Sequence, residues 1–183
     1  MNLVFVDVDT QLDFLYPGGA LYGPGAEHLM PALTRLAEHA RRNQIPVIST
    51  MDAHTESDPE FRDWPHHCVD GTLGQRKPQA LLIDGGKQVF VKKQTLDPFR
   101  SPDMARALAE LEADRYAVYG VFTEICVRHA VLGLAKAGKN VEVVVDAVRP
   151  IDDAKARAAF DEFAGAGVKT TRLDDLLAGS KRL

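Results

Sequence analysis

Cysteine, long apolar runs and surplus positive charge are all lacking in this sequence. Only two cysteines, Cys68 and Cys126, occur among 183 residues, which excludes a disulfide framework. The formal net charge of −4 gives no basic footprint for nucleic acid or for an anionic membrane surface. No apolar run approaches the ~20 residues that a membrane-spanning helix needs. We therefore expect neither a nucleic-acid partner nor a membrane partner.

A secretory leader is also missing from the pattern of the first residues. Met1 to Val6 carry no charged leader segment and pass directly into a strand pattern, so we expect a reducing, cytoplasmic location. The composition, with 45% hydrophobic and 26% charged residues, is that of an ordinary globular protein. A chain of 183 residues fits one domain with a well-buried core, predicted over residues 1–183.

Short apolar runs alternate with segments of helical periodicity. The expected strands are 3–8, 45–51, 88–91, 116–121, 141–145 and 168–171. The expected helices are 27–42, 101–113, 124–137, 152–164 and 173–178. This alternation predicts an α/β fold of three layers, α/β/α, around a mostly parallel sheet. Sites in such folds form at the carboxyl ends of the strands.

Cys126 lies between a strand pattern and a helical pattern. Thr123 is expected to cap the helix, which places Cys126 in the first helical turn. Unpaired backbone N–H groups and the positive end of the helix dipole favour a thiolate there. A cysteine of this kind is nucleophilic near neutral pH, although a buried structural cysteine fits the same local pattern.

An acid and a base follow two other expected strands. Asp9 could exchange a proton with a thiol, but Asp7 and Asp13 compete for this role and spacing alone does not choose. Lys93 could stabilise a thiolate and an oxyanion. Lys92 and Lys93 point to opposite sides of a strand, so only one of them can face the site.

Two further residues have weaker claims to a role beside the cysteine. His129, three positions after Cys126, could act as its base, although residues three apart share a helix face only roughly. Cys68 could be a metal ligand or a redox partner, but a small buried residue is the simpler interpretation. A redox pair would lack a C-x-x-C motif and would need the two sulfurs close together.

The segment 52–78 shows no periodicity and is rich in possible metal donors. The candidate donors among its carboxylate and imidazole groups are Asp52, His54, Glu60, His66 and His67. Mixed oxygen and nitrogen donors suit zinc, iron or manganese, and the absence of paired cysteines argues against a structural zinc site. Phe14 and Trp64 could be core aromatics or the two faces of a slot for a flat ring.

Three segments together resemble the isochorismatase-like cysteine hydrolases. They are residues 9–14 (DTQLDF), Lys93 with Phe99 six positions later, and residues 120–127 (GVFTEICV). The three occur in the family's order, and the likeness spans about residues 3–147. It implies the isochorismatase-like hydrolase fold and a covalent thioester made from an amide. Ammonia or an amine leaves first, and water then releases the acid.

The resemblance also assigns individual residues. The family's aspartate stands four positions before an Asp-Phe pair and its lysine six before a phenylalanine, which implies a triad of Asp9, Lys93 and Cys126. The family has a cis peptide at the position that corresponds here to Val121 and Phe122. The N–H groups of Phe122 and Cys126 would then form an oxyanion hole.

Within the family the chain resembles the metal-containing nicotinamidase branch. This likeness implies one divalent ion on Asp52, His54, Glu60 and His67, with the pyridine nitrogen of the substrate on the ion and Phe14 and Trp64 flanking the ring. True isochorismatases do not carry this metal set. The chain departs from the branch at Ala53, at Glu124-Ile125 and at Gln75-Arg76-Lys77, and these departures bear on the exact substrate.

The sequence therefore predicts a cysteine-dependent hydrolase of a small amide, with nicotinamide as the first candidate. One alternative is the same machinery acting on another small carbamoyl or ureido amide. A different alternative is a non-catalytic binding module. That alternative predicts that one residue of the triad is absent, whereas Asp9, Lys93 and Cys126 are all present. A homo-oligomer stays open, because the sequence does not show an interface.

Overall fold

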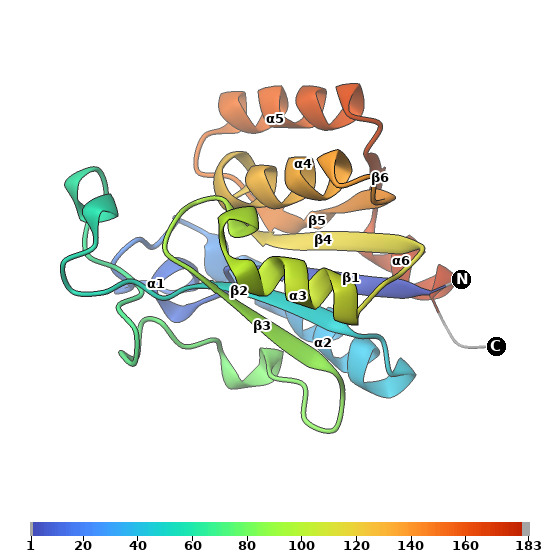
Figure 1. Cartoon of the computed structure of the whole chain (residues 1–183), viewed down its shortest axis with the longest axis horizontal. Helices are drawn as coiled ribbons and strands as arrows, with labels where there is room; N and C mark the ends of the chain where they lie inside the picture. Colours follow the sequence, from blue (N-terminus) through green and yellow to red (C-terminus); the bar gives the residue numbers. More distant parts are fainter. Residues whose placement is uncertain (1, 181–183) are drawn as a thin grey trace.

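Six parallel strands form one sheet in the computed structural model, which describes residues 2–180. The strands are β1 (Leu3–Val8), β2 (Val47–Asp52), β3 (Gln88–Lys93), β4 (Arg115–Val121), β5 (Val141–Arg149) and β6 (Lys169–Thr171). Their order across the sheet is β3-β2-β1-β4-β5-β6, and every neighbouring pair is parallel (Figure 1). The predicted parallel sheet is confirmed.

Helices connect the strands and cover the sheet. The α-helices are α1 (Leu12–Leu15), α2 (Met30–Asn43), α3 (Pro102–Glu110), α4 (Arg128–Lys136), α5 (Asp153–Gly165) and α6 (Leu173–Gly179). Short 3-10 turns are η1 (Ala26–Leu29), η2 (Pro59–Arg62), η3 (Gln79–Leu81) and η4 (Pro98–Arg100), and a π-helical turn is η5 (Thr123–Val127). No helix among residues 2–180 is both long and apolar enough to cross a membrane.

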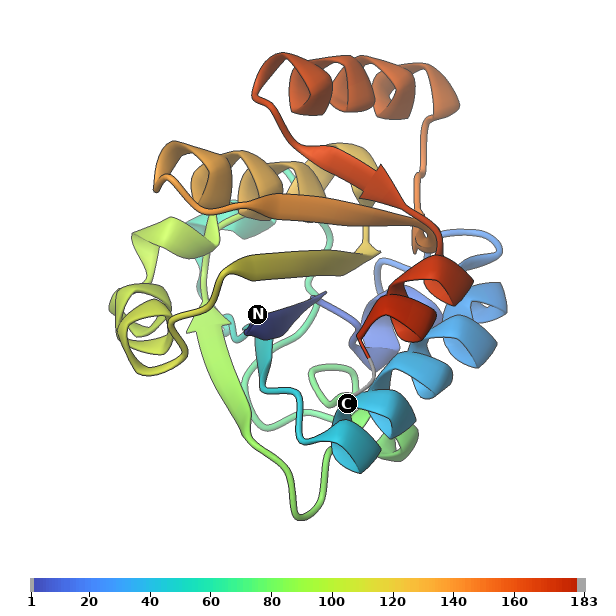
Figure 2. The ribbon, with the colours of Figure 1, turned by 90° about the vertical axis from the view of Figure 1, so that its right-hand side faces the viewer.

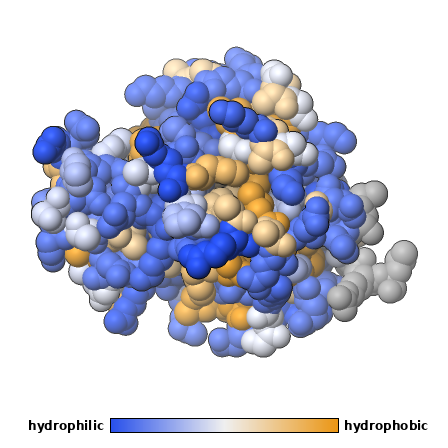
Figure 3. Space-filling model, in the orientation of Figure 1, coloured by the Kyte–Doolittle hydropathy of each residue, from blue (hydrophilic) through white to orange (hydrophobic). Residues whose placement is uncertain are grey.

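The central strand β1 is apolar except at Asp7, because both of its faces are buried. Val4, Val6 and Val8 belong to the core under α3, α4 and α5, whereas Phe5 belongs to the core under α2 and α6. The two groups of helices lie on opposite faces of the sheet (Figure 2), so the three-layer α/β/α prediction is confirmed. The face drawn in Figure 3 is mainly hydrophilic, with hydrophobic residues gathered near its middle.

The strand order places four chain segments around one crevice. From β1 the chain passes to β2 and then β3 at one edge, before it crosses to β4 on the other side of β1. In open α/β sheets, ligands bind beyond the carboxyl ends of the strands where the order reverses in this way. Asp9, Asp52, Lys93 and Cys126 all lie at or just after the carboxyl ends of these four strands.

Some predicted boundaries are wrong, and the differences have local causes. The helix expected from residue 27 begins with the 3-10 turn η1, and α2 starts only at Met30. The helix expected from residue 124 begins with the wider turn η5, whose N-cap is Phe122 and not Thr123. The strand expected at 141–145 continues to Arg149 through an irregularity in its pairing with β4.

Candidate active site

The end of β4, which leads to Cys126, has a backbone conformation that requires glycine. Gly120, the second-last residue of β4, has φ +122°, and a Cβ placed on it would lie 2.1 Å from the Val8 carbonyl oxygen. Only glycine tolerates both the backbone conformation and the contact. The peptide between Val121 and Phe122 is cis, as the family resemblance implied, and η5 then brings a buried Cys126 over the end of β1.

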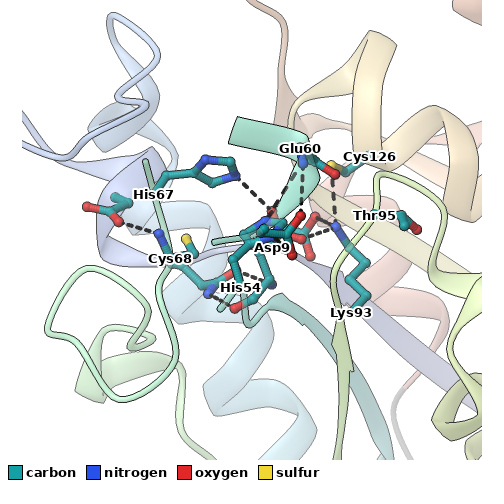
Figure 4. Close-up of polar contacts among 12 residues, drawn as sticks. Asp9, His54, Glu60, His67, Cys68, Lys93, Thr95 and Cys126 are labelled. Carbon is teal, nitrogen blue, oxygen red and sulfur yellow. Dashed lines mark hydrogen bonds and ion pairs between the residues drawn. The ribbon is translucent and has the colours of Figure 1, made fainter. Parts of the chain in front are cut away.

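Lys93, the last residue of β3, is buried next to the cysteine (Figure 4). Its Nζ lies 3.7 Å from the Sγ of Cys126 and 2.8 Å from Oδ2 of Asp9, and it also forms an ion pair with Asp52. Lys92 points away from the crevice. Its Nζ is exposed and lies 2.7 Å from an Asp70 oxygen. The alternation of a strand thus brings Lys93, and not Lys92, to the cysteine.

Asp9 is the aspartate that faces the cysteine and the lysine. It sits just after β1 with φ +50°, fully buried, and the Thr50 hydroxyl donates a hydrogen bond of 2.6 Å to its Oδ1. Asp7 instead forms a buried ion pair with Lys77, 3.0 Å away. Asp13 accepts a hydrogen bond of 2.7 Å from the Cys68 N–H. Of the three aspartates, Asp9 is thus the one that contacts the lysine beside the cysteine, and its catalytic role stays a prediction.

The pKa values of Cys126 and Lys93 are both raised, for different physical reasons. Burial raises the pKa of Cys126 well above its ordinary value; Lys93 opposes this rise, and the Asp9 and Asp52 carboxylates add to it. Burial alone would lower the pKa of Lys93, but Asp52 and Asp9 hold it well above its usual range. Desolvation of the sulfur therefore opposes the thiolate that the helix terminus is expected to favour.

Asp52, the last residue of β2, joins the lysine to a cluster of imidazoles. Its Oδ1 pairs with Lys93, while its Oδ2 lies 3.8 Å from Nε2 of His54 and 3.6 Å from Nε2 of His67. Burial would raise the pKa of Asp52, but Lys93 and the two histidines hold it below its ordinary value. The Asp52 carboxylate therefore lies between the Lys93 ammonium on one side and the two imidazoles on the other.

The donors of Asp52, His54 and His67 fit a single metal ion. Their candidate ligand atoms all lie within 4.8 Å of one another. Among the described residues, His54 Nε2 and Glu60 Oε1 are buried without a hydrogen-bond partner, and they lie 4.0 Å apart. Buried polar atoms of this kind require a partner, and a divalent cation would supply one. Glu60 thus lies at the edge of the three-residue group.

The outer ring nitrogens have partners that orient both imidazoles. Nδ1 of His54 lies 3.0 Å from an Asp58 oxygen, and Nδ1 of His67 lies 2.7 Å from the Pro65 carbonyl oxygen. Metal-binding histidines usually have such a partner on the second nitrogen. His66 is exposed and stacks on Phe61 with 4.1 Å between ring centroids. The structure thus brings His67, and not His66, into the cluster.

A hollow connects the cysteine to these donors. Phe14 and Trp64 both line it, together with Leu21, Leu96, Phe122, Ile125 and Ile151, and its polar lining is Asp52, Glu60, His67 and Cys126. Phe14 packs edge-on against Phe122, with 5.9 Å between centroids. Of the three departures from the nicotinamidase pattern, the one at Ile125 lines this hollow, whereas Ala53 lines a separate hollow together with Asp70 and Lys92.

Cys68 and His129, the two residues with weaker claims to a role beside Cys126, lie outside the group formed by Cys126, Lys93 and Asp9. Cys68 is a free, fully buried cysteine whose pKa is raised strongly by burial, and Cys126 is also free. His129 is half-buried, and burial lowers its pKa. It borders a neighbouring hollow with Glu124 and Lys155, outside the group formed by Cys126, Lys93 and Asp9.

Sequence reasoning missed three residues that hold this site together: Gln11, Thr50 and Asp58. Thr50 had a usable signal, because it is two residues before Asp52 in a strand and so points to the same side. Asp58 is four residues after His54 in an irregular segment, and Gln11 contacts residues 41 and 64 positions away. Neither contact could be inferred from local periodicity.

Comparisons with known proteins show which family the chain resembles along its length. Residues 3–175 match the isochorismatase domain family. A nicotinamidase of Acinetobacter baylyi is 25% identical over 201 residues, covering 92% of this chain and 91% of the relative. A pyrazinamidase of Pyrococcus horikoshii, solved in complex with zinc, superposes with a TM-score of 0.85 at 28% identity, over 94% of this chain and 99% of the other.

A second solved structure has a different named substrate. The N-carbamoylsarcosine amidase of Thermoplasma acidophilum superposes with a TM-score of 0.83 at 27% identity, over 95% of this chain and 98% of that one. The family match covers nearly the whole chain, and the three relatives described above, which are similar along nearly their full length, are named as amide-hydrolysing enzymes. The chain therefore belongs to the isochorismatase family and is an amidohydrolase of that family.

Proposed function

We propose that this protein hydrolyses a small amide through a thioester on Cys126, with nicotinamide as the first candidate substrate. The observation that carries the proposal is the buried Lys93 ammonium, 2.8 Å from an Asp9 oxygen and 3.7 Å from the Cys126 sulfur. A nucleophile, a proton acceptor and a fixed cation are the groups that nucleophilic acyl transfer requires.

The first half of the proposed reaction forms the thioester. The Asp9 carboxylate accepts the thiol proton while the Cys126 sulfur attacks the amide carbonyl carbon. The N–H groups of Phe122 and Cys126 are the proposed donors to the resulting oxyanion. The C–N bond then breaks, Asp9 returns its proton to the leaving nitrogen, and ammonia departs. Lys93 stabilises the negative charge as it moves between sulfur and carboxylate.

The second half releases the acid. Asp9 takes a proton from a water molecule whose oxygen attacks the thioester carbon. The C–S bond breaks, and the Cys126 sulfur takes the proton back from Asp9. The products are one carboxylic acid and one ammonia per amide, and the enzyme returns to its neutral thiol.

The donor set Asp52, His54, Glu60 and His67 would hold one divalent ion, for which zinc, iron and manganese are the candidates. When bound, such an ion supplies a Lewis acid that can bind a pyridine nitrogen. Phe14 and Trp64 are the proposed walls around the ring. The names of the nicotinamidase relative and of the zinc-bound pyrazinamidase support a pyridine-like amide.

A second candidate is another small carbamoyl or ureido amide. The likeness to an N-carbamoylsarcosine amidase favours it, as does Ile125, which lines the hollow at a position where the nicotinamidase pattern has a different residue. The same triad would cleave that C–N bond in the same way. The two candidates differ in the group that fills the hollow and in their need for the metal.

Ammonia release from a panel of small amides tests the proposal. The panel contains nicotinamide, benzamide and aliphatic carbamoyl compounds, each assayed with and without a chelator. We expect nicotinamide to be the best substrate and its turnover to fall with the chelator. Turnover of carbamoyl compounds alone would favour the second candidate. No ammonia from any amide would defeat the proposal and favour the non-catalytic binding module.

A further inference from the structure

Asp52 lies at the end of β2, beyond the point where the neighbouring strand β1 has ended, so β1 offers no backbone partner to it. In a parallel ladder, the N–H and C=O groups of one residue both point to the same neighbouring strand. Val8, the last residue of β1, pairs with Thr50, and the chain then turns away at Asp9 with φ +50°. Strand β2 continues for two residues beyond that pair and ends at Asp52. The missing neighbour would leave buried backbone groups of Asp52 without partners.

The side chain of Gln11 supplies the missing neighbour. Its Oε1 accepts a hydrogen bond of 2.7 Å from the Asp52 N–H, and its Nε2 donates one of 2.8 Å to the Asp52 carbonyl. The same Nε2 donates a second bond of 2.7 Å, to the carbonyl of Gln75. Gln11 is fully buried, so water does not compete for these bonds. One side-chain amide thus continues the ladder of the sheet where β1 has ended.

The position of the Asp52 backbone matters because its carboxylate faces two groups at once. Oδ1 pairs with Lys93, and Oδ2 lies 3.6 Å from the metal-facing nitrogen of His67. The other side of Asp52 is held independently, since the next residue, Ala53, donates a hydrogen bond of 2.9 Å to the Lys93 carbonyl. A shift of β2 at Asp52 would therefore move the carboxylate relative to both the lysine and the imidazoles.

We propose that Gln11 is a positioning residue that fixes Asp52 for metal binding and for its pairing with Lys93. The inference rests on the proposed function, because it assumes that Asp52 is a metal ligand. Gln11 makes its contacts with the backbone of Asp52 and so acts without touching the ion or the substrate. Removal of its amide should weaken metal binding even in a protein that remains folded.

Titration calorimetry of the full-length protein with Zn²⁺ or Mn²⁺ tests this inference. The variants are Gln11→Met, which keeps the length but loses all three hydrogen bonds, and Gln11→Asn, which keeps the amide but is one methylene too short. Loss of an outer partner of a metal ligand typically weakens binding ~10- to 100-fold. We expect a loss in that range for both variants, with a fall in kcat/KM of at least similar size.

Ser49→Ala is the matched control. The Ser49 hydroxyl is also buried in β2 and makes two side-chain hydrogen bonds, to Asp7 at 3.0 Å and from Gln88 at 2.8 Å. Its variant should lose stability but keep the metal affinity of the parent protein. Thermal unfolding of each variant shows whether the compared proteins are folded.

The outcomes separate this inference from the function on which it rests. If the parent protein binds metal and folded Gln11 variants bind it equally well, Gln11 has no positioning role. An equal loss of affinity in Ser49→Ala would assign the effect to general destabilisation and would also contradict the inference. If both Gln11 variants unfold and Ser49→Ala stays folded, Gln11 is required for folding, which contradicts a role limited to positioning. If the parent protein binds neither ion, the metal proposal itself fails.

Discussion

Replacement of Lys93 by methionine should destabilise the protein in a strongly pH-dependent way. The change keeps the length of the side chain but removes the buried cation between Asp9 and Asp52. Breaking a buried ion pair by removal of one partner typically costs ~3–5 kcal/mol, because the remaining charge is left uncompensated. Here two carboxylates lose the same partner, so we expect at least the lower end of that range at pH 7.

The sign of the pH dependence follows from the pKa shifts. The pKa of Asp52 is lowered in the folded protein, so its ion pair contributes stability above the unfolded pKa, and this is lost as the pH falls through the folded pKa. The pKa of Lys93 is raised, so its contribution is present below the unfolded pKa and is lost as the pH rises through the folded value. The free energy of unfolding that Lys93→Met loses relative to the parent protein should therefore be largest near neutral pH and smaller below pH ~4.

Urea unfolding at pH 7 and at several pH values below ~4, with a chelator present, measures this difference. Lys92→Met is the matched control, because Lys92 is the neighbouring lysine and its pair with Asp70 is exposed. Exposed pairs of this kind contribute ~0–1 kcal/mol. Equal destabilisation by the two substitutions, or a Lys93→Met effect that does not change with pH, would refute the reasoning.

Three further predictions concern the metal, the substrate and the second cysteine. His54→Ala or His67→Ala should weaken divalent-metal binding ~10-fold or more in elemental analysis and calorimetry, while His66→Ala should leave metal content unchanged; equal effects would contradict the assignment of ligands. Nicotinamide should exceed benzamide in kcat/KM by ~100-fold or more, because benzamide lacks the ring nitrogen; equal rates would defeat the nicotinamidase assignment and leave a broader amidase. Cys68→Ala should lose stability but keep most of its kcat, since the Cys68 side chain is buried in the core and does not line the hollow; a loss as large as that of Cys126→Ala would contradict this.

The place of the site could be predicted from the sequence because parallel strands end at a common edge. Asp9, Asp52, Lys93 and Cys126 each follow or end an apolar run, and a strand's alternation separates Lys93 from Lys92. The choice of Asp9 over its neighbours needed the family pattern, because it depends on partners far along the chain. Those partners are Lys77 for Asp7 and the backbone of residue 68 for Asp13.

Two features of the site could not be predicted from the sequence: the raised pKa of Cys126, and the hydrogen bonds from Gln11 that hold the backbone of Asp52. Local reasoning placed Cys126 at a helix terminus and could not weigh the desolvation that raises its pKa. The clamp from Gln11 to Asp52 joins segments 41 residues apart. It exists because β1 ends two residues before β2 does, which is a property of the assembled sheet.

The central claim is a thioester on Cys126, and mass spectrometry of the protein after rapid acid quenching tests it most directly. During turnover of nicotinamide, the peptide that contains Cys126 should carry the acyl group of the substrate. Cys126→Ala should carry none, and its turnover should fall at least ~1,000-fold. Substantial turnover by folded Cys126→Ala, or an acyl group found on another residue during turnover, would contradict the account.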